Sequence, residues 1–167
     1  MTLDELLAIS PVIPVVTVHD AARAVPLAEA LLDGGVAVIE VTLRTPAALA
    51  AIELIASAVP GVTAVAGTVC TPAQARDSLQ AGAAGLVSPG LTEGLAAAVA
   101  RQGTPWLPGV ATASDILRGF EYGCSRFKLF PANVAGGAGA LRAFAGPFPE
   151  VRFCPTGGVT PALAREY

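Results

Sequence analysis

A single lysine lies in a strand-like run near the end of the chain. Lys128, in RFKLFP, is the only lysine among the 167 residues. Side chains alternate between the two faces of an extended strand, so Arg126, Lys128 and Phe130 share one face. The opposite face carries the apolar Phe127 and Leu129. Because an uncharged lysine amine attacks carbonyl compounds to form a Schiff base, Lys128 is a candidate nucleophile.

A carboxylate and a guanidinium follow the same alternation in an earlier run, VAVIEVTLR. Glu40 and Arg44 share one face of this predicted strand, and the other face is wholly apolar. Burying charged groups costs several kcal/mol unless they are well paired. Charged side chains on buried strands of an apolar chain therefore indicate a catalytic or binding role. Glu40 is a candidate acid and base for carbinolamine formation, dehydration and carbon–carbon cleavage. Arg44 is a candidate for bidentate binding of a substrate carboxylate.

Structural roles remain open for these residues. If the predicted strands close into a barrel, Lys128 could extend its amine to the open end of that barrel. It could also form a structural ion pair with Glu40. Arg44 could cap the rim of a barrel instead of binding a ligand. Thr68, in AGTV, stands at the end of another predicted strand, where its hydroxyl could face a substrate or only satisfy the backbone.

Two adjacent glycines, Gly157 and Gly158, follow the predicted strand that ends at Thr156. A helix is expected to begin near Pro161. Adjacent glycines let backbone N–H groups surround a phosphate at a helix N-terminus. A tight turn between strand and helix explains the pair equally well, so the motif alone is a weak sign of an anion site.

Short β-branched runs alternate with Ala- and Leu-rich stretches about every 20 to 25 residues, which is typical of parallel βαβ units. The pattern predicts one α/β domain, residues 1–167, either closed or doubly wound. Seven consecutive units with similar short loops favour a (β/α)8 TIM barrel, of which seven strands are visible, over a doubly wound sheet. Active sites of such barrels lie at the carboxyl ends of the strands. The predicted strands are Val12–Val18, Val36–Leu43, Thr63–Val69, Gly85–Ser88, Thr104–Pro108, Arg126–Phe130 and Val151–Thr156.

Capping signals mark the helices between these strands. Their predicted starts are Asp20, Thr45-Pro46, Thr71-Pro72 and Thr92. Their predicted left-handed C-terminal residues are Gly34, Gly82 and Gly103.

Composition excludes several classes of function. The chain is 53% hydrophobic and 14% charged, with a net charge of −3 and no basic cluster, which argues against nucleic-acid binding. The N-terminal MTLDELLAIS reads as an acidic amphipathic helix, so we expect neither a signal peptide nor a membrane span, and a cytoplasmic location. His19 is the only histidine and has no clustered carboxylates, so no metal or cofactor is predicted. A metal-dependent aldolase or isomerase remains an alternative that EDTA sensitivity would favour.

Several motifs together resemble one enzyme family. They are PVIPV, GGVAVIEVTLRTP, AGTV, SPGLTE, EYGCSRFKLFPA and AGPFPEVRFCPTGGVTP, in this order, and they cover the chain from about Ser10 to Tyr167. The chain resembles the class I KDPG/KHG aldolases, which act on 2-keto-3-deoxy-6-phosphogluconate and 4-hydroxy-2-oxoglutarate. EVTLRT, FKLFPA and FCPTGG are the most specific elements.

The resemblance implies roles for individual residues. Lys128 would be the Schiff-base lysine, Glu40 the general acid/base, and Arg44 the residue that binds the keto-acid carboxylate. Residues implied to surround the pyruvate part are Thr68, Phe130 and Thr156, and those implied to form part of the phosphate site are Gly157 and Gly158.

The resemblance also implies a reaction and an assembly. The expected enzyme is a metal-independent, cytoplasmic, homotrimeric lyase that yields pyruvate with glyceraldehyde 3-phosphate, as in the Entner-Doudoroff pathway, or pyruvate with glyoxylate. A 6-phosphogalactonate aldolase and a non-catalytic phosphometabolite-binding barrel are the alternatives. The family's eighth strand, with a Gly-Ser pair that completes the phosphate site, and its last helix have no counterpart before Tyr167. We expect the sequence to be a fragment of a longer product.

Overall fold

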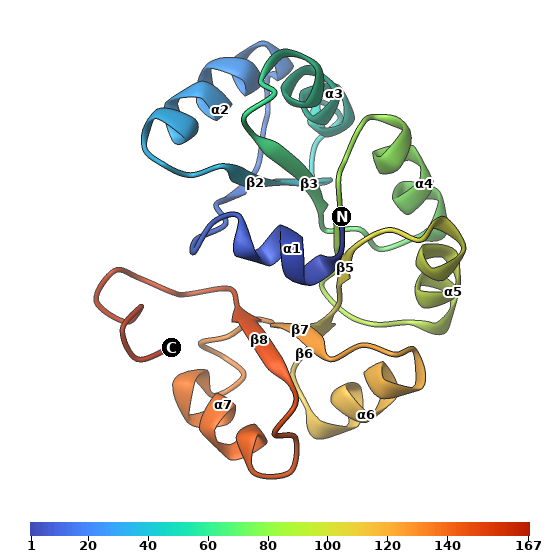
Figure 1. Cartoon of the computed structure of the whole chain (residues 1–167), viewed down its shortest axis with the longest axis vertical. Helices are drawn as coiled ribbons and strands as arrows, with labels where there is room; N and C mark the ends of the chain where they lie inside the picture. The colour runs from blue at the N-terminus through green and yellow to red at the C-terminus, as the bar shows by residue number, and fades with distance from the viewer. The chain divides into compact units, whose positions relative to one another are not determined.

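The computed structural model describes residues 1–167 and contains two parallel sheets (Figure 1). One sheet has the strand order β1 to β5: Val15–Val16, Val38–Thr42, Thr63–Gly67, Leu86–Val87 and Trp106–Leu107. The other has the order β6 to β8: Gly109–Val110, Arg126–Leu129 and Arg152–Pro155. Two compact units result, residues 1–88 with 93–106 and residues 89–92 with 107–167, and each is described by itself.

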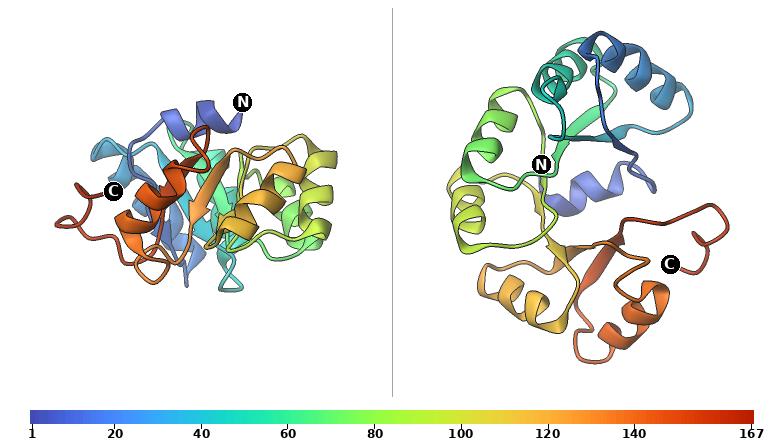
Figure 2. Two further views of the ribbon diagram at one scale, coloured as in Figure 1. Left: turned by 90° about the horizontal axis from the view of Figure 1, so that it is seen from below. Right: turned by 180° about the vertical axis from the view of Figure 1, so that it is seen from behind.

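Helices follow most of the strands, as Figure 2 shows from two further sides. The α-helices α1 to α7 are Leu3–Ala8, Ala24–Asp33, Ala48–Ala58, Pro72–Gln80, Glu93–Gln102, Ala113–Glu121 and Gly137–Ala145, and a 3-10 helix, η1, spans Ala21–Arg23.

All seven predicted strand runs contain an observed strand, but the run around Pro108 differs from its prediction. β5 ends at Leu107, and a separate strand, β6, begins at Gly109. Proline has no N–H and cannot donate to a strand ladder. The Pro108 carbonyl instead accepts a hydrogen bond from the backbone N–H of Lys128 at 2.9 Å, which joins this segment to β7.

The predicted helix starts are confirmed at three of the four positions. The Asp20 carboxylate accepts from the Ala22 N–H at 3.0 Å and caps η1, Thr71 forms a capping box at α4, and Thr92 directly precedes α5. The start predicted at Thr45-Pro46 is wrong, since α3 begins at Ala48. The Thr45 hydroxyl donates to the carbonyl of Val18, and α3 has no side-chain cap.

The predicted helix ends are confirmed at Gly82 and Gly103, whose φ angles are +92° and +62°. At α2 the prediction misses by one residue. Gly34 has a φ of −79°, and the left-handed residue is Gly35, at +82°. The helix expected near Pro161 is also wrong, because residues 161–166 form successive turns.

In the first unit, β2 is buried along its whole length. Ile39 and Val41 are fully buried, as are Ile52 and Ile55 of α3, which packs against β2 and β3. Figure 1 shows α2 and α3 beside each other over this strand pair. The apolar face of VAVIEVTLR therefore forms the contact with helices, as predicted.

In the second unit, aromatic rings fill the space between β7, β8 and their helices. Phe127 is fully buried, and its ring lies where a side chain at Gly119 of α6 would be. The ring centroids of Phe127 and Phe153 are 6.4 Å apart, and those of Phe144 and Phe153 are 5.9 Å apart. Because Phe127 faces the helices, the alternation of β7 places Lys128 on the opposite face.

The start of α6 predicts a pH-dependent contribution to stability. The Asp115 carboxylate accepts hydrogen bonds from the N–H groups of Ala111 and Thr112, at 3.1 and 3.0 Å, and from the Thr112 hydroxyl at 2.8 Å. Burial raises the pKa of Asp115, but these hydrogen bonds outweigh it, so the pKa lies below its usual value. The stabilisation is therefore present above the unfolded pKa of about 3.9 and is lost as the pH falls through the folded pKa.

We expect Asp115→Asn to lower the free energy of unfolding by about 1 kcal/mol at pH 7. The difference from wild type should shrink as the pH falls below about 4. Urea unfolding at a series of pH values measures both effects. Asp33→Asn, at an exposed carboxylate of α2, is the matched control. If Asp115→Asn lowered the free energy of unfolding by the same amount down to acid pH, this account would be contradicted.

Candidate functional site

In the first unit, β2 and β3 position Glu40. The side chain of Glu40 is only 4% exposed, although it carries a carboxylate. In the register of the pair, Glu40 lies opposite Val65 and Thr42 lies opposite Gly67. The Glu40 carboxyl lies against Gly67, where a Cβ atom would overlap its Oε1. The predicted acid/base residue is therefore buried in the middle of β2, and its carboxyl lies beside Gly67, at the carboxyl end of β3.

Arg44 and Thr68 meet just beyond the same two strands. The Arg44 Nε donates a hydrogen bond to the Thr68 Oγ1 at 3.1 Å. This bond uses the inner nitrogen of the guanidinium. The two terminal nitrogens can therefore form bidentate hydrogen bonds with a carboxylate. Thr68 has a φ of +59°, and it is the only non-glycine residue with a positive φ. Such a conformation is costly for a β-branched residue and is typical of functional sites.

In the second unit, β7 positions Lys128 and Phe130. Lys128 is 4% exposed and lies on the face of β7 opposite Phe127, which faces the helices. Its Nζ lies 5.3 Å from the centroid of the Phe130 ring. A ring face attracts a cation and excludes water from it. Arg126, on the same face, instead donates to the Ser125 hydroxyl and the Glu150 carbonyl at the other end of the strand.

Thr156, Gly157 and Gly158 directly follow β8 and lie beside the loop that follows β7. The carbonyls of Thr156 and Gly157 accept from the N–H groups of Ala132 and Asn133, at 2.8 and 3.1 Å. Gly157 and Gly158 have φ angles of +99° and +75°, which only glycine adopts readily. The Thr156 hydroxyl donates to the Cys154 carbonyl at 3.3 Å. The glycine pair is thus held beside the carboxyl end of the strand that carries Lys128.

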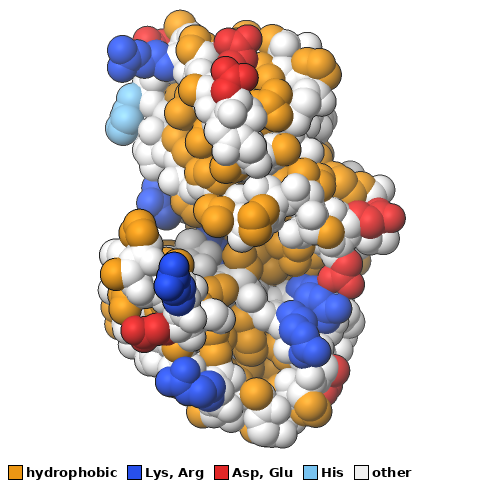
Figure 3. All heavy atoms as spheres, turned by 60° about the vertical axis from the view of Figure 1, so that its left-hand side comes forward, with side chains coloured by type: hydrophobic (Ala, Val, Ile, Leu, Met, Phe, Trp, Pro, Cys, Tyr) orange, Lys and Arg blue, Asp and Glu red, His pale blue; other side chains and the backbone are white.

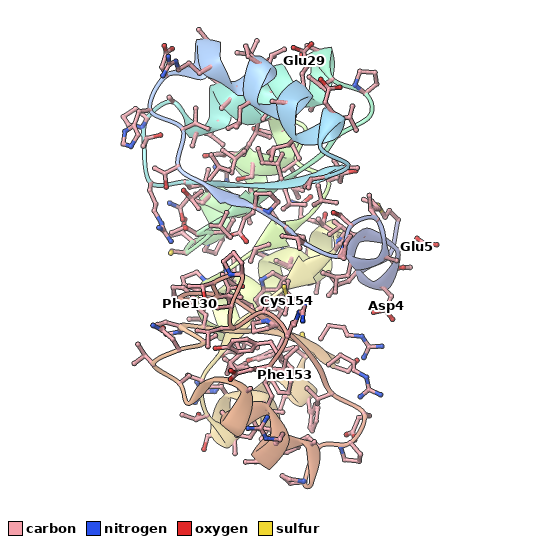
Figure 4. The ribbon with its side chains drawn as sticks, turned by 90° about the vertical axis from the view of Figure 1, so that its left-hand side faces the viewer. Asp4, Glu5, Glu29, Phe130, Phe153 and Cys154 are labelled. Carbon is pink, nitrogen blue, oxygen red and sulfur yellow. The ribbon has the colours of Figure 1, made fainter.

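Figure 4 shows the strand faces in this unit, with Phe130, Phe153 and Cys154 labelled. Phe153 lies on the α7 side of β8, in contact with Phe144. Cys154 alternates to the other side, and it is in register with Lys128. The face of β7 and β8 that carries Lys128 is therefore separate from the aromatic core.

The structure groups the predicted site residues within each unit. The first unit brings together Glu40, Arg44 and Thr68, and the second brings together Lys128, Phe130, Thr156, Gly157 and Gly158. Two further residues were not predicted. Gly67 lies under the Glu40 carboxyl, and the Asn133 side chain fills the space beside Gly158. Only the glycine in AGTV offered a sequence signal, because close approach of another group often requires glycine.

A hollow of about 830 Å³ lies elsewhere in the first unit, around the end of β1, η1 and α2. It includes His19 and Arg23 but none of the predicted site residues. Asp20, the neighbouring carboxylate, caps η1. No group of three or more His, Cys, Asp or Glu side chains in residues 1–167 is placed to hold a metal ion.

The charged side chains lie singly or in small groups on the face shown in Figure 3, with no continuous basic patch. None of the helices has both the length and the apolar character needed to cross a bilayer.

Comparisons with known proteins identify the family of the chain. Residues 3–167 match the family model for KDPG and KHG aldolase. The KHG/KDPG aldolase of Escherichia coli (strain K12) is 49% identical over 164 residues, which are 98% of this chain and 77% of that protein. The crystal structure of 2-keto-3-deoxy-6-phospho-gluconate aldolase from Zymomonas mobilis ATCC 29191 has a TM-score of 0.97 and 47% identity, covering 100% of this chain and 81% of the other.

A second solved structure is informative about the chemistry of a relative. It is the KDPG aldolase from Legionella pneumophila with pyruvate captured at low pH as a covalent carbinolamine intermediate. Its TM-score is 0.97 at 46% identity, covering 100% of this chain and 81% of that one. These matches confirm the predicted fold class and the resemblance noted in the motifs. The chain belongs to the KDPG and KHG aldolase family.

Proposed function

We propose that this protein is a class I aldolase that cleaves 2-keto-3-deoxy-6-phosphogluconate to pyruvate and glyceraldehyde 3-phosphate, and 4-hydroxy-2-oxoglutarate to pyruvate and glyoxylate. The observation that carries the proposal is the burial of Lys128, the only lysine of the chain, whose exposed fraction is 4%. A carbinolamine joins an amine nitrogen to a carbonyl carbon, and a relative at 46% identity holds pyruvate in that form. In this chain Lys128 is the only side-chain amine that can do so.

The proposed reaction begins when the Lys128 amine attacks the C2 carbonyl of the keto acid. The resulting carbinolamine loses water to give an iminium ion. The C4 hydroxyl then gives its proton to a base, the C3–C4 bond breaks, and its electron pair moves into the iminium to form an enamine as the aldehyde leaves. Protonation of the enamine at C3 and hydrolysis of the imine release pyruvate and restore the amine.

Glu40 is the proposed acid and base for these proton transfers. Its carboxyl is buried beside Gly67, at the carboxyl end of β3, where the active sites of this fold class lie. One carboxyl can serve successive steps, because each step moves a single proton between the same few atoms. Burial also excludes bulk water, which could otherwise protonate the enamine in place of Glu40.

Arg44 is the proposed binding residue for the keto-acid carboxylate. Its Nε is held by Thr68, so the guanidinium plane is fixed before substrate arrives, and the terminal nitrogens present a fork. Phe130 and Thr156 are proposed to line the pyruvate part, since Phe130 lies over the Lys128 amine and Thr156 follows the neighbouring strand.

Gly157 and Gly158 are proposed to hold part of the substrate phosphate. Both have positive φ angles and lie in the turn after β8, and successive backbone N–H groups in a turn can form an anion-binding nest. The hydrogen bonds from Ala132 and Asn133 fix this turn. The geometry supports a phosphorylated substrate but does not require one, so the smaller hydroxyoxoglutarate remains within the proposed range.

Three further properties are proposed on the resemblance to the family. They are metal independence, a homotrimeric assembly and a cytoplasmic location. Metal independence also has a chemical reason, because the iminium ion accepts the electron pair that a Lewis acid would stabilise in a metal-dependent aldolase.

The test combines trapping with a comparison of substrates. Borohydride added in the presence of pyruvate should leave a reduced adduct on the peptide that contains Lys128, and none on the N-terminal amine. Pyruvate release should be measured from both proposed substrates and from the 6-phosphogalactonate isomer, with and without EDTA. Absence of any adduct would favour a non-catalytic binding protein, and a loss of activity with EDTA would refute metal independence.

A further inference from the structure

The backbone at Gly67 lies directly under the side chain of Glu40. We propose that Gly67 is a positioning residue: its missing side chain provides the space that holds the Glu40 carboxyl at the carboxyl ends of β2 and β3. This inference rests on the proposed acid/base role of Glu40. The two strands run side by side in Figure 1, within the first unit.

The register of the two strands shows how far the Glu40 side chain extends. The Cα of Glu40 is opposite Val65, and Gly67 is two residues further along β3. Two residues of strand correspond to about 6.6 Å along its axis. The Glu40 carboxyl nevertheless lies against Gly67. The side chain therefore extends along the sheet, from the position opposite Val65 toward the carboxyl end of β3.

The space at Gly67 is occupied by the side chain of Glu40. The three atoms nearest to a Cβ built at this position are Oε1, Cγ and Cδ of Glu40, all closer than real Cβ contacts allow. The backbone conformation gives no other reason for a glycine, since Gly67 is the last residue of a regular strand and is not among the residues with positive φ. The requirement for glycine is therefore set by the carboxylate above it.

Thr42 lies opposite Gly67 in the register of β2 and β3. Thr42 is fully buried, and its hydroxyl donates to the Val16 carbonyl at 3.0 Å and lies 3.0 Å from the Thr17 hydroxyl. These bonds hold Thr42 toward β1. The atoms nearest to a Cβ built at Gly67 accordingly belong to Glu40 and not to Thr42.

A methyl group at position 67 would move the carboxyl from this place. A displacement of about 1 Å in a reacting group can lower a rate by about 10²-fold. The contact between Arg44 and Thr68 lies beyond the strands and would persist, so substrate binding should change little. The proposed signature is a fall in kcat with little change in KM.

The experiment is a double-mutant cycle on pyruvate release, with Gly67→Ala, Glu40→Gln and both together. We expect Gly67→Ala to lower kcat by about 10²-fold, with KM within about 2-fold of wild type. In the Glu40→Gln background the same change should cost almost nothing more, because the displaced group no longer transfers protons. Gly94→Ala, in α5 with open space around its Cβ, is the control and should be unchanged.

A stability cycle tests the steric part independently of catalysis. Gly67→Ala should lower the unfolding midpoint in wild type but not in Glu40→Ala, where the space above residue 67 is empty. This holds even if the single variant folds poorly, since the second change should then restore folding. Equal effects of Gly67→Ala in both backgrounds, on kcat or on stability, would overturn the inference. A Glu40→Gln variant with wild-type kcat would instead refute the proposed role of Glu40.

Discussion

Replacement of Lys128 by methionine should lower kcat for pyruvate release by about 10⁴-fold or more, because the proposed covalent intermediate cannot form without the amine. Methionine has nearly the same length and suits the buried position, where Lys128 is 4% exposed. The neighbouring Phe127 and Leu129 are fully buried and should keep β7 in place. Steady-state pyruvate release measures the loss of activity, and borohydride trapping measures the loss of the covalent adduct. The two losses should occur together.

The charge of Lys128 can be separated from its nucleophilicity. Lys128→Arg keeps a cation that can lie over the Phe130 ring, yet a guanidinium does not form the Schiff base. It should be as inactive as the methionine variant. Arg142→Met, which removes an exposed cation from α7, is the matched control and should retain activity. An active Lys128→Arg enzyme would exclude the covalent mechanism.

Replacement of Glu40 by glutamine should lower kcat by about 10² to 10⁴-fold, the usual contribution of a positioned acid or base. Glutamine keeps the shape of the side chain over Gly67 but cannot accept and return a proton. Exchange of the pyruvate methyl protons in D2O, followed by NMR, should slow by a similar factor, because it requires proton transfer at the same carbon of the enamine.

Two results would locate an error in this assignment. Normal methyl-proton exchange in Glu40→Gln would mean that another group moves the proton at C3. A large rise in KM with unchanged kcat would mean that Glu40 binds substrate and takes no part in proton transfer. Glu53→Gln, at an exposed carboxylate of α3, controls for the loss of one negative charge.

Features that depend on a few neighbouring residues were predictable from the sequence. Side-chain alternation correctly assigned Phe127 to the helix side of β7 and Lys128 to the other face. The capping box at Thr71 was predictable for the same reason, since its partner Gln74 is three residues away. These patterns follow from the covalent geometry of strands and helices and need no knowledge of distant contacts.

Predictions failed at several points, each for its own physical reason. The Thr45 hydroxyl donates to Val18, 27 residues away, and α3 begins at Ala48 without a side-chain cap. At the end of α2 two glycines compete, and the second adopts the left-handed conformation. Pro108 divides its strand because the ladder there would need an N–H that proline lacks.

The sequence by itself determined the chemical groups of the proposed site and their places at the carboxyl ends of strands: one lysine, one inward carboxylate, one arginine and a glycine pair. Only the tertiary structure decided how they are held, through the bond from Arg44 to Thr68, the space over Gly67 and the packing of Asn133 on Gly158. The physical reason is that these contacts depend on the register between separate strands and loops, which hydrogen bonding across the whole sheet sets and no residue's own neighbours specify.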